Sequence, residues 1–468
     1  MARWRRHPLV TAACVALGAA AVALFVLAPA PRPNILLISV DTLRADGIGC
    51  YGGNPAASPA LDRLAAASAV FGAAYTPRGE TAPSLATLLT GLNPSHHGVL
   101  RNDCRMPEEI ATLPRLLADA GYETAAFAAN RVVPIAKLDR DFAHSRCTHA
   151  EDAPQWRWDE AATAAAIEFL GAPRERPFFA WVHLMDPHSP YQAGPEDRGK
   201  FAAGPSRIDG SREQLEFLTR AAEPLQEEDL RAVRARYDEE VAGSDRRIGR
   251  ILDALDARGL APRTIVIVLA DHGEELGERQ RYFFHSLSVH RSVHRVPLLW
   301  RAPGLAARSI DAPASVADIA PTLAAALALA FPHACDGVDL APLLAGRRLA
   351  RDAVFTEYEN AIAGVFTVRH HFIHNPDGVA LPLGAALDDG AAGAAGGTAP
   401  FRFKVARAEL YDIASDPTEQ RNIAETSPEI RAELLRRIEA YLAGRRFREP
   451  DVIIDASVRQ QLRELGYL

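Results

Sequence analysis

Short apolar runs recur along the chain, and amphipathic helical stretches separate most of them. The runs are Asn34–Val40, Glu123–Ala129, Phe178–Met185, Thr264–Ala270 and Val296–Trp300. A strand that is apolar on both sides has to be covered on both sides, and a helical crossover between strands suits parallel pairing. The alternation therefore predicts an α/β fold with a mostly parallel sheet that is sandwiched by helices.

The pattern changes near residue 350, which predicts a second, smaller unit. Short strands are expected at Ala353–Glu357 and Val365–Arg369, and a helix at Pro428–Ala443. We therefore expect a core over 32–349, a C-terminal α+β subdomain over 350–447, and a tail over 448–468. The length of 468 residues is ample for this division.

The first 31 residues predict a membrane anchor or a signal peptide. Arg3, Arg5 and Arg6 precede a run without charge, Leu9–Ala30. As a helix this run would reach about 33 Å, enough for the ~30 Å hydrocarbon core of a bilayer. An uncleaved anchor fits its length better than a cleaved signal, and the arginines favour a cytoplasmic N-terminus. In both cases the rest of the chain is expected outside the cytoplasm, periplasmic or secreted.

Composition excludes two other classes of protein. The formal net charge is −7 and the pI is about 6.1, so no basic field favours nucleic acid as a partner. Five cysteines are too few for a disulfide scaffold in a chain of this length.

Polar residues follow four of the predicted strands directly. Asp41 follows the first, Asn130 the second, Asp186 and His188 the third, and the pair Asp271-His272 the fourth. Because ligands bind outside the carboxyl ends of strands in open α/β sheets, we expect these side chains at one edge.

Thr81 is expected beside the same edge. The stretch Thr81–Gly91 reads as a short helix, with Pro83 near its start and Gly91 just past its end. The unpaired amides of a helix N-terminus favour an anion. From position alone, Thr81 is either a helix N-cap or part of an oxyanion site.

Two carboxylates and one imidazole, from Asp41, Asp271 and His272, suit a single divalent cation. Ca²⁺ and Mn²⁺ fit this donor set best, with Mg²⁺ and Zn²⁺ as alternatives. A cation that touched the Thr81 hydroxyl would lower its pKa and make Thr81 a usable nucleophile.

The order of these motifs resembles the sulfatase family of the alkaline phosphatase superfamily. The match includes the segments 32–46 (RPNILLISVDTLRAD), 186–191 (DPHSPY), 271–274 (DHGE), 409–413 (ELYDI) and 462–468 (LRELGYL). The resemblance implies an alkaline-phosphatase-like fold and an ester hydrolase. It also implies that Asp41, Asp271 and His272 bind the metal, with Thr81 as nucleophile and further metal contact.

The resemblance assigns roles to three more side chains. His188 resembles a histidine that contacts the transferred group and protonates the leaving oxygen, and His285 resembles a basic group with a similar duty. Asn130 falls near a substrate-contacting position. By contrast, His183 is expected to be a core histidine within its strand, and Arg246-Arg247 to lie on a solvated helix face.

The chain departs from the family at the nucleophile. Sulfatases modify a Cys or Ser in a Cys/Ser-x-Pro-x-Arg signature to formylglycine, whereas this chain has Thr81 first and Leu85 last. Formylglycine is therefore excluded, and Thr42 stands where relatives carry a second acid. Threonine resembles the nucleophile of phosphoester enzymes in the superfamily.

The sequence therefore predicts a single-metal hydrolase that cleaves sulfate, phosphate or phosphonate esters through Thr81, with phosphoryl transfer favoured over sulfuryl transfer. Its substrate would be a small-molecule, glycan or lipid ester. Two alternatives stay open: a transferase of phospho-headgroups at the membrane surface, and a non-catalytic binding protein on a sulfatase scaffold.

Overall fold

The computed structural model describes residues 32–150, 152–201, 204, 206–220, 225–278, 283, 285–286, 288–358, 361–382, 402–453 and 455–464. The chain divides into two units, Met1–Pro33 and Asn34–Leu468. The predicted anchor, Leu9–Ala30, lies outside the described residues. Among the residues that are described, no helix combines the length and the apolar character that a membrane crossing needs.

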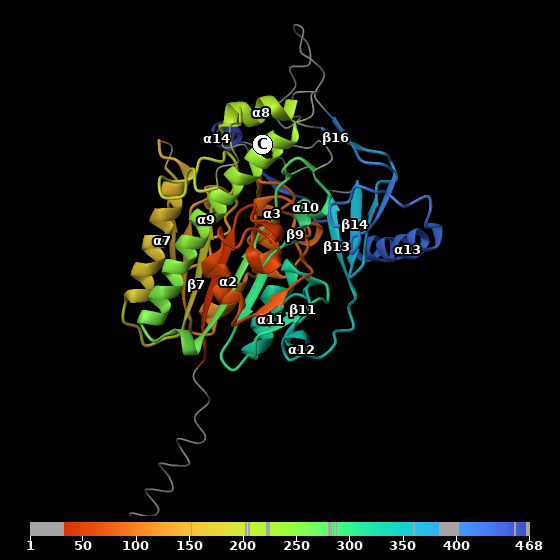
Figure 1. The fold of residues 1–468 in the computed structure, drawn as a ribbon. Coiled ribbons are helices and arrows are strands. Elements are labelled where there is room, and N and C mark those ends of the chain that lie inside the picture. Colours follow the sequence, from red (N-terminus) through yellow and green to blue (C-terminus); the bar gives the residue numbers. More distant parts are fainter. Residues whose placement is uncertain are drawn as a thin grey trace, which may run out of the picture. The chain divides into compact units, whose positions relative to one another are not determined.

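An eight-stranded sheet forms the centre of the Asn34–Leu468 unit (Figure 1). Of these strands only β10 runs against the others, so the sheet is mostly parallel, as predicted. In spatial order the strands are β11 (Arg308–Ile310), β2 (Ala69–Phe71), β10 (Leu298–Arg301), β8 (Thr264–Ala270), β1 (Asn34–Val40), β7 (Phe178–Leu184), β5 (Glu123–Ala128) and β6 (His144–Cys147).

The central strands are buried on both faces. Every residue of β1, β7 and β8 is buried, which explains their continuous apolar runs. In the middle of the sheet, Leu37 of β1 lies opposite Trp181 of β7 and Ile267 of β8. The sequence prediction was wrong at Val296–Trp300, which is divided at Pro297 into β9 (Arg295–Val296) and β10. Proline has no N–H for a ladder, so it separates the two strands.

Helices cover the sheet. The helix α7 (Gln155–Gly171) packs on β5 and β7, and the long helix α9 (Glu227–Ala257) runs beside it (Figure 1). In turn α9 contacts α2 (Pro59–Ala65), which reaches β10. A second group comprises α3 (Thr81–Thr90), α5 (Leu113–Asp119), α6 (Val132–Ile135) and α11 (Ile319–Ala326).

The C-terminal part forms a smaller α+β subdomain, as predicted, and its sheet is antiparallel. Its order is β13 (Ala353–Tyr358), β14 (Ile362–Thr367), β15 (His370–His374) and β18 (Ala408–Asp412). The helix α13 (Pro428–Gly444) packs on β14 and β15. Tyr75 and Phe366 join this sheet to the core, since their rings stack with centroids 4.1 Å apart.

The described residues also form one small three-stranded sheet and two short strand pairs. The strand β3 (Ala74–Tyr75) lies between β12 (Ala314–Ser315) and β9, and β16 (Ala380–Pro382) pairs with β17 (Arg402–Lys404). In the C-terminal tail, β19 (Asp451–Val452) pairs with β4 (Cys104–Arg105), and α14 (Ala456–Glu464) follows. The domain boundaries at 349 and 447 stay predictions.

Candidate active site

The four strands that end in polar residues are neighbours in the sheet. Their order is β8, β1, β7 and β5, so that Asp271, Asp41, Asp186 and Asn130 follow adjacent parallel strands. The strands β7 and β8, which come later in the chain, pair with β1 in parallel, one on each side. This topology brings the predicted side chains to one edge.

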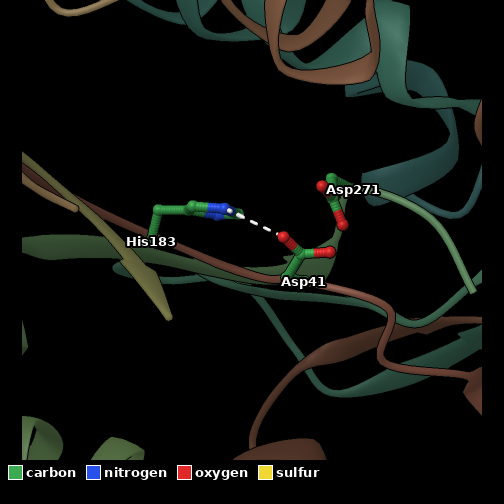
Figure 2. Close-up of side chains that lie close together, drawn as sticks. All are labelled: Asp41, His183 and Asp271. Atoms are coloured by element: carbon green, nitrogen blue, oxygen red, sulfur yellow. Dashed lines mark ion pairs between the residues drawn. The ribbon is translucent and has the colours of Figure 1, made fainter. Parts of the chain in front are cut away.

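Asp41 and Asp271 lie side by side with no exposure to solvent (Figure 2). Burial, together with the charge of Asp41, raises the pKa of Asp271 well above its usual range. Burial acts against ionisation of Asp41 too, but contacts with His183, His188 and His272 hold its pKa below the ordinary value. Asp41 Oδ1 and Asp271 Oδ2 have no hydrogen-bond partner in the described part of the chain.

His272 completes a donor set around these two oxygen atoms. Its Nε2 lies 3.7 Å from Asp41 Oδ1 and 3.5 Å from Asp271 Oδ2. Its Nδ1 donates to the carbonyl of Gly273 at 3.0 Å, which leaves a lone pair on Nε2. Burial lowers the pKa of His272 to about 3, so the ring is neutral. Two hydrogen-bond-deficient carboxylate oxygens and a neutral imidazole fit a divalent cation.

Thr81 is the first residue of α3, where Glu80 occupies the N-cap position without a side-chain capping bond. The Thr81 hydroxyl lies 3.4 Å from Asp41 Oδ2 and 3.4 Å from His272 Nε2. The helix ends at Gly91, which has a φ of 70° that glycine adopts without strain. Thr81 thus presents its hydroxyl to Asp41 and His272, which follow β1 and β8, rather than capping α3.

His188 and His285 stand next to this group. The ring of His285 stacks on His272 with centroids 4.5 Å apart, and the His188 ring lies 5.2 Å from that of His285. His285 Nδ1 is 3.1 Å from Glu274 Oε1. Burial lowers the pKa of both His188 and His285, the latter to about 4, and raises that of Glu274 to about 8.

Comparisons with known proteins identify the family of this chain. A family model described as "Sulfatase" matches residues 33–329, which is more than half of the chain. This chain belongs to the sulfatase family. It is an ester hydrolase of that family.

Two curated relatives and one solved structure illustrate the similarity. An ulvan-active sulfatase from Formosa agariphila is 28% identical over 343 residues, covering 67% of this chain and 65% of the relative. A Δ4,5-hexuronate-2-O-sulfatase from Bacteroides thetaiotaomicron is 23% identical over 445 residues, with 84% and 85% covered. The phosphonate monoester hydrolase of Agrobacterium radiobacter superposes with a TM-score of 0.70 at 22% identity, covering 88% of this chain and 96% of that one.

The structure brings together every site residue that the sequence predicted for this sulfatase-family member. The Thr81 hydroxyl lies within hydrogen-bond distance of Asp41 and His272, and His272 Nε2 lies within ion-pair distance of Asp41 and Asp271. The rings of His188 and His285 adjoin this group. Their assignment as metal ligands, nucleophile and substrate groups stays a prediction.

Asn130 lies at the same edge but is turned toward a protein group. Its Nδ2 donates to Asp41 Oδ2 at 2.7 Å, and its Oδ1 accepts the Val132 backbone N–H at 2.8 Å. Both ends of the amide are therefore fixed by the protein. The role of Asn130 in contacting substrate stays a prediction.

Sequence reasoning missed two residues beside the site. His183 is buried in β7, as expected of a core histidine, but one ligand atom from each of Asp41, His183 and Asp271 lies within 4.8 Å of the others. Its register opposite Ser39 of β1 places His183 beside the strand that Asp41 follows, and the sequence alone carries no signal of that register. Asn102 is fully buried, and its Oδ1 accepts the Ala82 N–H at 2.8 Å, next to Thr81.

The prediction of a solvated face was wrong for Arg247. This guanidinium is buried and donates to Asp186 Oδ2 at 2.8 Å, with Asp159 Oδ2 at 3.5 Å. Asp159 in turn accepts the backbone N–H groups of Met185 and Asp186. The arginine thus neutralises the carboxylates that hold the start of the turn leading to His188.

We expect Arg247→Met to destabilise the fold by about 3–5 kcal/mol, because two buried carboxylates lose their cation. Burial raises the pKa of both Asp159 and Asp186 in the folded protein. The deficit should therefore be largest at high pH and shrink as the pH falls and these groups take up protons. Urea unfolding across a pH series measures it.

Arg231→Met is the matched control on the same helix. Arg231 forms an exposed pair with Glu227, so its loss should cost less than about 0.5 kcal/mol at every pH. Equal effects of the two substitutions on the free energy of unfolding would show that the buried Arg247 network does not stabilise the fold.

Proposed function

We propose that this sulfatase-family hydrolase cleaves phosphate or phosphonate esters by transfer through Thr81. The observation that carries the proposal is the position of the Thr81 hydroxyl, 3.4 Å from both Asp41 Oδ2 and His272 Nε2 at the start of α3. A hydroxyl in that position has acidic groups, an imidazole and a helix N-terminus around it. Those are the surroundings that a nucleophile in phosphoryl transfer needs.

Asp41, Asp271 and His272, with the Thr81 hydroxyl, would hold one divalent cation, Ca²⁺ or Mn²⁺ in preference to Mg²⁺ or Zn²⁺. Such a cation would offset the charge of the two carboxylates and lower the pKa of the threonine hydroxyl. The buried oxygens Asp41 Oδ1 and Asp271 Oδ2, which lack partners among the described residues, support this assignment.

The residues divide the proposed reaction into two displacements. In the first, the deprotonated Thr81 Oγ1 bonds to phosphorus, the bond to the ester oxygen breaks, and protonated His188 gives its proton to the leaving oxygen. In the second, water attacks phosphorus, Thr81 Oγ1 leaves, and the water proton returns to His188. His285 would bind an oxygen of the transferred group.

The chemistry of threonine favours phosphoryl over sulfuryl transfer. Formylglycine has a second hydroxyl that can expel sulfate from a covalent intermediate, but a threonine ester must be resolved by attack at phosphorus or sulfur. The fold likeness to a phosphonate monoester hydrolase is in keeping with this preference. Relatives named for sulfated glycans make a glycan ester a candidate substrate class, beside small-molecule and lipid esters.

Replacing the nucleophile gives a direct test. Thr81→Ala should reduce turnover of a phosphodiester or phosphonate ester by more than about 10³-fold, since the attacking oxygen is lost. Thr81→Ser keeps the hydroxyl and should retain most of the rate. Steady-state kinetics with Mn²⁺ supplied would measure both, and urea unfolding should differ by less than about 1 kcal/mol because Glu80 holds the N-cap position. Undiminished turnover in Thr81→Ala would remove the covalent route.

We also propose that the catalytic unit works outside the cytoplasm, with the uncharged run Leu9–Ala30 as its anchor. Leu17→Arg places a charge mid-run, at a cost of about 2.5–3.5 kcal/mol in a bilayer, and should release the protein from membranes or block export. Membrane fractionation and protease accessibility of intact cells measure this. A wild-type catalytic unit that is protected inside intact cells would contradict the proposal, and a mature chain lacking the run would indicate a cleaved signal.

A further inference from the structure

The buried ring of His183 faces the carboxylate of Asp41. Its Nε2 is 3.8 Å from Asp41 Oδ2 (Figure 2), which is longer than a hydrogen bond, and it has no hydrogen-bond partner among the described residues. Both side chains are fully buried. Figure 2 shows the ring nitrogen directed at the Asp41 carboxylate, while Asp271 lies on the far side of that carboxylate. The role of His183 depends on which ring nitrogen carries the proton.

The contact between His183 Nδ1 and Ser39 indicates which ring nitrogen carries the proton. His183 Nδ1 lies 2.9 Å from Ser39 Oγ, which already accepts the indole N–H of Trp181 at 2.8 Å. An indole N–H can only donate, so the serine oxygen is the acceptor of that bond. In the described contacts of Ser39, His183 Nδ1 is the acceptor left for the serine hydroxyl proton. This chain of donors leaves the His183 proton on Nε2, facing Asp41.

His272 has the opposite arrangement. Its Nδ1 faces the Gly273 carbonyl, which only accepts, so the proton sits on Nδ1 and the lone pair on Nε2. A metal ligand needs that lone pair, and a second-sphere donor needs a proton. The two histidines that flank Asp41 are therefore prepared for different tasks.

The two oxygens of Asp41 reflect this division. Oδ2 accepts the Asn130 amide at 2.7 Å and is the oxygen nearest to His183. Oδ1 is buried, lacks a hydrogen-bond partner among the described residues, and is 3.7 Å from His272 Nε2. The Asn130 amide and the Thr81 hydroxyl thus donate to Oδ2, which His183 also faces, and Oδ1 is left for a cation.

We propose that His183 is a positioning residue, which directs its Nε2–H at Asp41 Oδ2 and so orients Oδ1 toward the cation, without binding the cation itself. The inference rests on the proposed function in one respect, that Asp41 binds a divalent cation. The chain Trp181–Ser39–His183–Asp41 links two neighbouring strands, so the sheet itself sets the orientation of this ligand.

Mn²⁺ titration of purified full-length protein by calorimetry tests the proposal without an activity assay. His183→Leu removes the donor and should raise the Mn²⁺ dissociation constant about 10–100-fold, as loss of outer-sphere partners does. His183→Gln offers an amide N–H in place of the imidazole N–H and should stay within about threefold of wild type. A ligand histidine would not be rescued in this way.

His97→Leu is the matched control. His97 is also fully buried and hydrogen-bonded to a hydroxyl, Thr87 Oγ1 at 3.1 Å, but it lies on α4 (Pro94–His97). Its loss should reduce stability without changing Mn²⁺ affinity. If His97→Leu weakens Mn²⁺ binding as much as His183→Leu, the effect is general destabilisation and the proposal is overturned.

Two spectroscopic readouts complete the test. Electron spin-echo modulation of bound Mn²⁺ should report one coordinated imidazole nitrogen, from His272, in both wild type and His183→Gln. A second coordinated nitrogen that disappears in His183→Gln would make His183 a ligand and overturn the proposal. ¹⁵N NMR of the metal-free protein, with the His183 signals assigned by their loss in His183→Gln, should show the proton on Nε2. A proton on Nδ1 would overturn the assignment even in a protein that binds no Mn²⁺, and absence of Mn²⁺ binding by wild type would instead contradict the proposed function.

Discussion

Repulsion between two buried carboxylates, Asp41 and Asp271, is the constraint on which the site depends. They end neighbouring parallel strands, and neither side chain reaches solvent. Two anions in such a place are stable only if one takes up a proton or a cation lies between them. The raised pKa of Asp271 expresses this conflict in the protein alone. The surrounding side chains, His183 and Asn130 on one side and His272 on the other, are arranged around these two carboxylates.

Fully buried strands hold these carboxylates and their neighbours in fixed positions. β1 is enclosed between β7 and β8, all three strands are buried throughout, and α3 brings Thr81 to their carboxyl ends. A second buried charge network, centred on Arg247, holds the backbone that leads from β7 to His188. Because catalysis by position needs groups held within fractions of an ångström, a fully buried sheet edge is a suitable support.

The sequence was sufficient for the parts of this arrangement that are local. Each apolar strand and the polar residue after it can be read from consecutive residues, so Asp41, Asp271 and His272 were placed at one edge, and the helix from Thr81 was recognised by Pro83 and Gly91. The single strand predicted at Val296–Trp300 is instead two strands, because Pro297 has no N–H for the ladder.

The residues that were missed depend on partners far away in the chain. His183 looks like a core residue until its register against Ser39 is known, and Arg247 looks solvated until α9 is seen packed on α7. Periodicity can identify which face of a helix is buried. It cannot show that Arg247 on that face of α9 contacts Asp186 and Asp159, which lie on other elements.

The central claim is that the transferred group passes through Thr81, and stereochemistry at phosphorus tests it most directly. A chiral phosphorothioate ester hydrolysed in ¹⁸O-water yields a product whose configuration records the number of displacements. Each in-line displacement inverts phosphorus, so transfer to Thr81 followed by attack of water predicts overall retention. Overall inversion would mean that water attacks the ester in a single step, and it would contradict the account.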